Sequence, residues 1–168
     1  MLITTLLTVP LLGILAIITN PYNVNNESTS KIIALITSIL NLTISLFIFI
    51  VFDFSNINYQ FVQEVHEFNG LNIYLGIDGL SIYFVLLTTI LIPIVLVSSW
   101  NSISDNIKSY VIIILLLETL LLGVFLVLNI FLFYVFFEST LIPLFILIGI
   151  YGSSNKVRAS FYLFLYTQ

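Results

Sequence analysis

The stretch IIILLLETLLLGVFLVLNIFLFYVFFESTLIPLFILIGIY occupies residues 112–151 and is almost entirely apolar. A helix that crosses the hydrocarbon core of a bilayer, about 30 Å thick, needs about 20 residues. The stretch is therefore too long for one crossing. Asn129 interrupts it, and asparagine tolerates turn geometry better than its apolar neighbours. The pattern predicts two membrane-spanning helices, 109–128 and 130–151, joined by a tight hairpin near Asn129.

The composition of the whole chain agrees with a membrane protein. Of its 168 residues, 60% are hydrophobic and 7% are charged, against about 25% charged in soluble domains, and the mean hydropathy is +1.20. A soluble core of this length cannot cover so much apolar surface. The absence of cysteine excludes disulfides and thiolate metal sites, and the net charge of −4 argues against nucleic-acid binding. The one histidine, His66, lies between two glutamates and is interpreted as solvent-exposed rather than as a metal ligand.

Three more apolar segments have the length of a span, at 2–19, 31–52 and 80–100. The first is interpreted as a retained span because it lacks the preceding positive charge and the cleavage site of a signal peptide. A sixth apolar segment, 159–168, would rise about 15 Å as a helix, half of a bilayer. The fold class predicted is an all-α polytopic membrane protein, one membrane domain over 1–168, with five transmembrane helices and a truncated sixth.

The loop between the second and third predicted helices, residues 53–79, is long and contains two runs with strand-like composition around Asn69-Gly70. Asn-Gly is the strongest short signal for a β-hairpin, so a hairpin is expected here. Asp78 or Ser81 is expected to cap the third helix.

The positive charges predict the orientation in the membrane. With five spans, Lys31, Lys108, Lys156 and Arg158 all fall on the same side. Positive charges in short loops favour the cytoplasmic or matrix side. The N-terminus and the long loop 53–79 are therefore expected on the opposite side.

Glu118 and Glu138 are the two carboxylates inside the apolar stretch. Measured from the predicted turn, Glu118 lies 11 residues away and Glu138 eight, which corresponds to depths of about 16 Å and 12 Å. Two antiparallel helices would therefore hold their acids at similar depth, near the middle of the bilayer.

The energetics of a carboxylate at this depth are balanced between its two protonation states. Inserting the charged form costs about 2.5–3.5 kcal/mol, and protonating a glutamate at pH 7 costs about 3.7 kcal/mol when its reference pKa is 4.3. Because the two costs are similar, the group can change state when a charge or water approaches, as a proton relay requires. The alternative interpretation is a structural acid that stays protonated and hydrogen-bonds a neighbouring helix.

Local features favour a functional role for Glu138. Pro143 in the same helix removes its own N–H and displaces the carbonyl of Ser139, so a kink is expected beside Glu138. The hydroxyls of Ser139 and Thr140 are expected to bond freed backbone groups or water. In the preceding helix, Gly123 is expected to let another helix approach the other carboxylate closely.

Three stretches carry a resemblance to a known family: GIDGLSIYFVLLTTILIPI at 76–94, LNIFLFYVFFESTLIPLFILIGIYGS at 128–153 and FYLFLYTQ at 161–168. They resemble chain 4 of NADH:ubiquinone oxidoreductase, respiratory complex I. The resemblance runs along most of the chain and is strongest from Gly76 onward.

The resemblance implies an antiporter-like, proton-translocating subunit that couples electron transfer from NADH to ubiquinone with proton pumping. It implies that Glu138 pairs with a lysine on a later broken helix, whereas Glu118 matches an acid found in only some members. NADH, FMN, iron–sulfur clusters and ubiquinone are expected on other subunits, with no cofactor and no metal on this chain. The expected location is the mitochondrial inner membrane, N-terminus toward the intermembrane space, with a bacterial cytoplasmic membrane as second choice.

The partners implied are other membrane-arm subunits, the lipid bilayer, and a second chain or missing segment that supplies the later helices and lysines, because no Lys or Arg lies in the interior of a predicted span. Two other hypotheses remain open at this point. One is a subunit of a multisubunit Na⁺/H⁺ antiporter. The other is a non-conducting structural fragment of the membrane arm.

Overall fold

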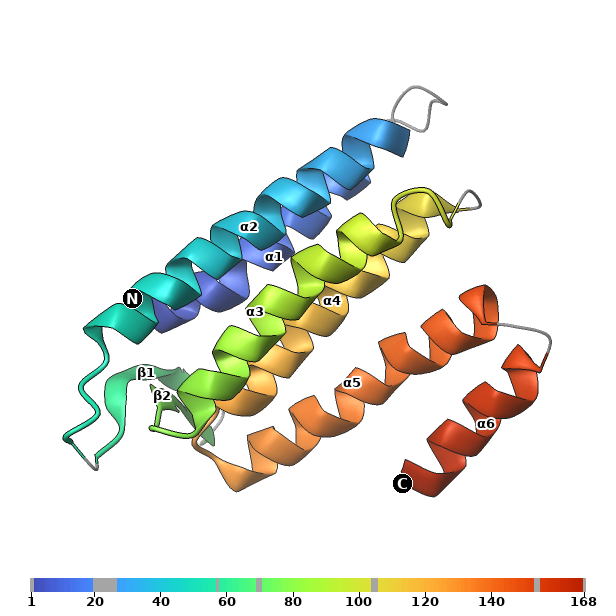
Figure 1. Ribbon diagram of the computed structural model, residues 1–168. Helices are drawn as coiled ribbons and strands as arrows, with labels where there is room; N and C mark the ends of the chain where they lie inside the picture. The colour runs from blue at the N-terminus through green and yellow to red at the C-terminus, as the bar shows by residue number, and fades with distance from the viewer. Residues whose placement is uncertain are drawn as a thin grey trace.

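The computed structural model describes residues 2–19, 27–56, 58–68, 71–103, 106–152 and 155–167. Within them the chain forms six helices and one two-stranded sheet (Figure 1). The elements in chain order are α1 (Leu2–Thr19), α2 (Glu27–Val51), β1 (Gln60–Phe68), β2 (Leu71–Ile77), α3 (Ser81–Ser98), α4 (Ile107–Leu126), α5 (Ile130–Tyr151) and α6 (Lys156–Thr167).

Five of these helices, α1 to α5, are long and apolar enough to cross a membrane. The predicted fold class, five spans plus a shorter sixth helix with a hairpin between the second and third, is confirmed. The second helix begins at Glu27, four residues before its predicted start. The fourth runs over Ile107–Leu126, two residues earlier at both ends than predicted. The sixth has 12 residues, a rise of about 18 Å.

α4 is the central helix of the bundle. It packs against α1, α2, α3 and α5, whereas α5 packs against α4 and α6. Figure 1 shows α5 and α6 to one side of the α1–α4 group. α4 also has the largest buried share of the five spans, 56%, and α5 has the smallest, 17%.

The core of the α1–α4 group consists of two apolar clusters, one toward each end. The cluster beside the β-hairpin joins the start of α1 and the end of α4, and the other joins the end of α1 and the start of α4. The buried members of the first include Ile3, Leu6, Ile48, Ile82 and Leu122, and those of the second include Ile17, Ala34, Ile92, Tyr110 and Leu115.

Large apolar side chains also cover the outside of the helices. Ile50 is 78% exposed, Ile130 85% and Leu165 68%. Such a surface is expensive in water and favourable in lipid or against further helices. The outer face is thus that of a chain surrounded by hydrocarbon or by other membrane helices.

The predicted β-hairpin is present, with β1 and β2 antiparallel. Its proposed turn, Asn69-Gly70, lies outside the described residues, and so does the side chain of His66. The hairpin is fixed to the end of α4, because the Leu128 N–H donates to the Tyr74 carbonyl at 3.0 Å. Gly76 permits this contact, since a Cβ there would lie 2.9 Å from Leu128 Cδ1.

The start of α3 is capped as expected by Asp78. Its Oδ1 accepts a hydrogen bond of 2.6 Å from the N–H of Ser81, the first residue of the helix. Hydrogen bonding from Ser81 also lowers the pKa of Asp78 below its ordinary value, because the bond favours the charged carboxylate.

The turn between α4 and α5 lies where the sequence predicts it, but Asn129 acts differently. Its backbone is extended, with φ −89° and ψ 124°, rather than in a turn conformation. Its side chain accepts a hydrogen bond of 2.9 Å from the Phe131 N–H, so Asn129 is the N-cap of α5. Capping, not turn propensity, is the physical reason for the break.

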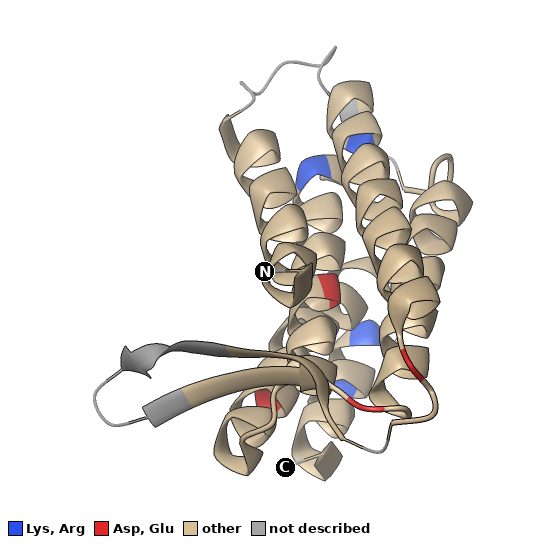
Figure 2. Cartoon of the chain, turned by 90° about the vertical axis from the view of Figure 1, so that its left-hand side faces the viewer, with Lys and Arg blue, Asp and Glu red and all other residues tan. Residues whose placement is uncertain are grey.

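The four cations gather at one end of the bundle. Lys108 Nζ, at the start of α4, donates to the Ile18 carbonyl near the end of α1, at 3.3 Å. Lys156 Nζ, at the start of α6, donates to the Ile150 carbonyl near the end of α5, at 2.7 Å. Figure 2 shows how sparse charges are along the helices. Lys31 and Arg158 lie near the starts of α2 and α6, at the same end of the bundle; the side of the membrane that this end faces stays a prediction.

Candidate functional site

Glu118 lies in the interior of α4 and is fully buried, with 0% of its surface exposed. Its Oε1 accepts a hydrogen bond of 2.7 Å from Nδ2 of Asn41 in α2, which is also 0% exposed. Neither Glu118 Oε2 nor Asn41 Oδ1 has a hydrogen-bond partner among the described residues. The pair thus contains one satisfied contact and two buried acceptors that lack a donor.

The position of the pair in the bundle is midway between the two apolar clusters. On α4, Leu115 belongs to one cluster and Leu122 to the other, with Glu118 between them. On α2, Ala34 and Ile48 bracket Asn41 in the same way. The carboxyl and the amide are therefore enclosed by hydrocarbon on both sides.

The sequence reasoning missed Asn41. A signal existed, because an asparagine in the middle of an apolar span has a side chain that hydrocarbon cannot satisfy. It shares the buried face of α2 with Ser38 and Ser45. Ser45 Oγ also bonds Thr89 Oγ1 of α3 at 2.7 Å, so polar contacts join α2 to two neighbouring helices.

Glu138 lies in α5, where it is half-buried. Tyr134, one turn earlier on the same helix, is 58% exposed. The helical period puts Glu138 on one stripe with Ile142, Phe145 and Gly149.

This stripe faces α6 and not the interior of the α1–α4 group. The Phe145 ring contacts Phe161 and Phe164 of α6, with centroids 5.5 Å and 5.9 Å away. Gly149 lies opposite Ser160 of α6. Together with Ile142, these three rings line an open apolar groove of about 290 Å³. Glu138 lies one turn beyond this groove along the stripe.

The two carboxylates lie at similar depth but do not share a site. Glu118 is eight residues before the end of α4 and Glu138 eight residues after the start of α5, which is about 12 Å for each. Glu118, however, bonds α2, whereas Glu138 lies on the stripe that faces α6. The structure therefore places two separate acidic groups at one level of the bundle.

One of the features expected around Glu138 differs in detail, whereas the expected kink beside Pro143 stays a prediction. α5 continues as a helix through Pro143, which is buried. The Ser139 hydroxyl donates to the Val135 carbonyl at 2.7 Å, and the Thr140 hydroxyl to the Phe137 carbonyl at 2.7 Å. These hydroxyls therefore bond upstream carbonyls of their own helix, not the backbone group that Pro143 leaves free.

Gly123 does permit a close helix contact, between α4 and α5. A Cβ at Gly123 would lie 2.7 Å from Cδ1 of Phe136. The ring of Phe136 thus occupies the space above the glycine. The contact lies five residues from Glu118, toward the hairpin end, and does not bring a helix onto the carboxyl group itself.

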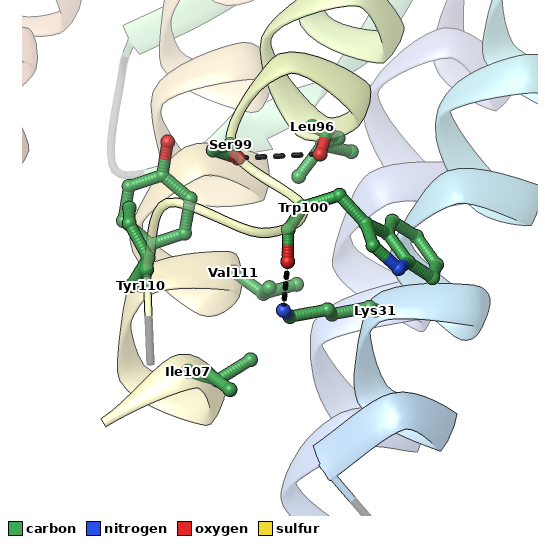
Figure 3. A pocket seen from close by; sticks show the side chains of 8 residues that line it. Lys31, Leu96, Ser99, Trp100, Ile107, Tyr110 and Val111 are labelled. Carbon is green, nitrogen blue, oxygen red and sulfur yellow. Dashed lines mark hydrogen bonds between the residues drawn. The ribbon is translucent and has the colours of Figure 1, made fainter. Parts of the chain in front are cut away.

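Lys31 lies at the opposite end of the bundle from the hairpin. It donates to the backbone carbonyl of Trp100, and its Nζ is 5.6 Å from the centre of the Trp100 ring. The cavity beside it measures about 10 Å³ (Figure 3), enough for about one water molecule. Lys31 thus anchors the start of α2 to the end of α3, about 15 Å along α2 from Asn41.

Five apolar spans with a carboxyl group buried between helices define the class: a polytopic α-helical membrane protein with an ionisable group in its core. Intramembrane acids of this kind mark ion or proton pathways.

Comparison with known proteins supports the resemblance to chain 4 of NADH:ubiquinone oxidoreductase. A family model described as NADH:quinone oxidoreductase/Mrp antiporter, TM, matches residues 127–168. NADH-ubiquinone oxidoreductase chain 4 of Mycosarcoma maydis is 48% identical over 167 residues, 98% of this chain and 34% of that protein. NADH-quinone oxidoreductase subunit M of Rhodobacter capsulatus is 39% identical over 165 residues, 98% of this chain and 32% of that protein. The resemblance to chain 4 of NADH:ubiquinone oxidoreductase is confirmed.

A further relative is an uncharacterized 50.9 kDa protein in ND4 intron 1 of Podospora anserina. It is 69% identical over 145 residues, 86% of this chain and 32% of that protein. The chain spans about a third of the length of the curated relatives it matches.

Proposed function

We propose that this chain acts as part of a proton-translocating, antiporter-like subunit of respiratory complex I, where electron transfer from NADH to ubiquinone drives proton pumping. The observation that supports this most is the match to chain 4 of NADH-ubiquinone oxidoreductase along 98% of the chain. In this proposal the chain is a subunit of an H⁺-translocating NADH:ubiquinone reductase. NADH, FMN, iron–sulfur clusters and ubiquinone are held by other subunits.

Glu138 is the proposed relay residue. It is half-buried about 12 Å from the start of α5, near the open groove between α5 and α6. A partner group can therefore approach it from that side. The proposed partner is a lysine from outside this chain, on a later helix, as the family resemblance implies. Electrostatic coupling follows: Glu138 is ionised while the lysine is close and takes up a proton when the lysine's charge is drawn away.

Glu118 is proposed as the second proton-carrying group of the chain. Its hydrogen bond to Asn41 and its burial separate it from water, so any proton exchange there depends on rearrangement of the bundle. Its part in transport is therefore less direct than that of Glu138.

The proposed location is the mitochondrial inner membrane. The end that carries Lys31, Lys108, Lys156 and Arg158 faces the matrix, and the N-terminus and hairpin face the intermembrane space. The proposed partners are the other membrane-arm subunits, lipid, and the segment that supplies the later helices.

The membership test is purification of the native assembly through a tag on this chain. The proposal predicts co-purification with flavin and iron–sulfur subunits and with NADH:quinone activity. An assembly without these groups that exchanges Na⁺ for H⁺ would favour the antiporter alternative instead. The description of the matching family covers both classes, so this experiment separates them.

The relay role is tested by replacing Glu138 with glutamine in a complex that still assembles. The proposal predicts NADH oxidation that no longer drives normal proton pumping. A complex that assembles and pumps normally would favour a non-conducting, structural part for this chain.

A further inference from the structure

We infer that Glu118 carries a proton in the resting protein and that Asn41 holds it, so that the two side chains form an acid–amide pair closed by two hydrogen bonds. In this pair Asn41 Nδ2 donates to Glu118 Oε1, as observed, and the proton on Glu118 Oε2 is donated to Asn41 Oδ1. Asn41 is then the positioning residue of a proton-binding site between α2 and α4. The inference concerns the resting state of Glu118 and stands whether or not Glu138 acts as a relay.

The donors and acceptors of the pair indicate that Glu118 is protonated. Asn41 Nδ2 and Glu118 Oε1 are 2.7 Å apart, and the two remaining polar oxygens of the same pair are the buried acceptors without a donor. Two acceptors cannot satisfy each other. One added proton converts Oε2 into a donor and gives Oδ1 a partner within the pair. An acid and an amide have the complementary shapes for this arrangement, since each offers one donor and one acceptor on neighbouring atoms.

The neighbouring hydroxyls on the same helices are already used as donors. On α2, Ser38 Oγ donates to the Leu35 carbonyl at 3.0 Å and Ser45 Oγ to the Leu42 carbonyl at 2.8 Å. On α4, Thr119 Oγ1 donates to the Leu115 carbonyl at 2.9 Å. A hydroxyl has one proton, so none of these groups supplies the missing donor.

The charges nearest along the two helices are also used elsewhere. Lys31 on α2 bonds the Trp100 carbonyl and Lys108 on α4 the Ile18 carbonyl, and each lies ten residues from the pair, about 15 Å along its helix. On α5, Glu138 lies on the stripe whose Phe145 and Gly149 face α6. α1 and α3 contain no Asp, Glu, Lys or Arg. An ionised Glu118 would therefore have no counter-charge among the described residues.

The test is infrared difference spectroscopy of the assembled protein at neutral pH, comparing wild type with Glu118→Gln. The inference predicts loss of a carbonyl-stretch band of a protonated carboxylic acid in the variant. It predicts that this band shifts in Asn41→Leu and Asn41→Ser, because the acid loses its hydrogen-bonding partner. Ser38→Ala is the matched control: it removes a buried hydroxyl one turn away on the same face of α2 and is expected to leave the band unchanged.

Glu118→Gln is also expected to assemble as well as wild type. A glutamine amide offers Asn41 the same donor and acceptor that a protonated acid offers. Three results would overturn the inference. The first is a difference spectrum with only ionised-carboxylate bands, the second is an acid band at the same frequency in wild type and in the Asn41 variants, and the third is failure of Glu118→Gln to assemble. The first result is also the one expected if Glu118 is ionised and an ordered water donates the missing hydrogen bond. None of these results bears on pumping by Glu138, so the two proposals fail separately.

Discussion

Glu138 and Glu118 are the same residue type at the same level of the bundle, yet their surroundings differ. Glu118 is enclosed and paired with an amide, while Glu138 is half-buried and lies one turn beyond an open groove. A group that must exchange a proton with a moving partner needs access, and one that is sealed in the core contributes first to the fold. Residue identity alone does not distinguish these two environments; packing does, and the roles proposed for the two glutamates follow from it.

Replacement of Glu118 by alanine is expected to destabilise the bundle. It leaves the fully buried Asn41 side chain without its partner, and an orphaned buried polar group costs about 1–3 kcal/mol. The thermal midpoint of the detergent-solubilised protein measures this. Glu138→Ala is the comparison variant and is expected to lower the midpoint less, because Glu138 is only half-buried. Equal effects of the two variants would contradict the distinction.

The cap at Asp78 has a predictable pH dependence. Asp78→Ala removes the acceptor for the Ser81 N–H and is expected to cost about 1 kcal/mol. Because the pKa of Asp78 is lowered in the folded state by its bond to Ser81, its contribution is complete above the unfolded value of 3.8. That contribution disappears as pH falls through the folded value.

The measurement for Asp78 is the difference in thermal midpoint between wild type and Asp78→Ala across pH. The difference is expected to shrink on acidification. Asp78→Asn keeps an acceptor oxygen at the cap and is expected to lose little stability. A difference that grows as pH falls would show that the sign is wrong.

At the scale of elements, α4 and α5 are held together by size complementarity. The Phe136 ring fills the space above Gly123. Lipid gives helices little hydrophobic reason to associate, so such close packing matters more in a membrane than in water.

Gly123→Ala tests this contact. Its new Cβ would lie 2.7 Å from Phe136 Cδ1, so the helices or the ring must shift, at an expected cost of about 1–3 kcal/mol. Phe136→Leu in the same chain is expected to recover part of the loss in a double-mutant cycle of thermal stability. Gly79→Ala, where a Cβ meets nothing within 4 Å, is the control. Additive effects of the Gly123 and Phe136 changes would rule out the contact.

The presence of the five spanning helices was predictable from the sequence because the thickness of the bilayer fixes the length of an apolar run. The hairpin was predictable because Asn-Gly flanked by strand-like residues indicates one. The partner of Glu118 was not. Asn41 is 77 residues away in sequence. The sequence of one apolar helix does not determine which neighbouring helix each of its faces contacts. The function of Asn129 as a cap was missed for a related reason, since its composition fits both a turn and an N-cap.

At the scale of the whole molecule, different polar and charged groups lie at different positions along the bundle axis. The cations lie at one end, the hairpin at the other, and the Asn41–Glu118 pair midway between two apolar clusters. The stripe of Glu138 faces outward from the α1–α4 group. Its depth was predictable from residue counts, whereas the side of the bundle that it faces required the positions of α4 and α6.

The proposed orientation predicts which end reacts with an impermeant thiol reagent. The chain has no cysteine, so single substitutions give a clean signal. Asn58→Cys, exposed at the hairpin end, is expected to react from the intermembrane-space side of intact inner membranes. Ser102→Cys, exposed at the other end, is expected to react only after permeabilisation. The reverse pattern would invert the orientation and leave the fold unaffected.

The central claim is that Glu138 exchanges a proton within the membrane as electrons pass through the rest of the complex. Its most direct test is the number of protons translocated per NADH oxidised in sealed vesicles, for assembled complexes that carry Glu138→Gln, Glu138→Asp or Ser139→Ala. We predict a clear fall for the glutamine variant, at least partial recovery with aspartate, and no change for Ser139→Ala. A wild-type ratio in a fully assembled Glu138→Gln complex would contradict the account.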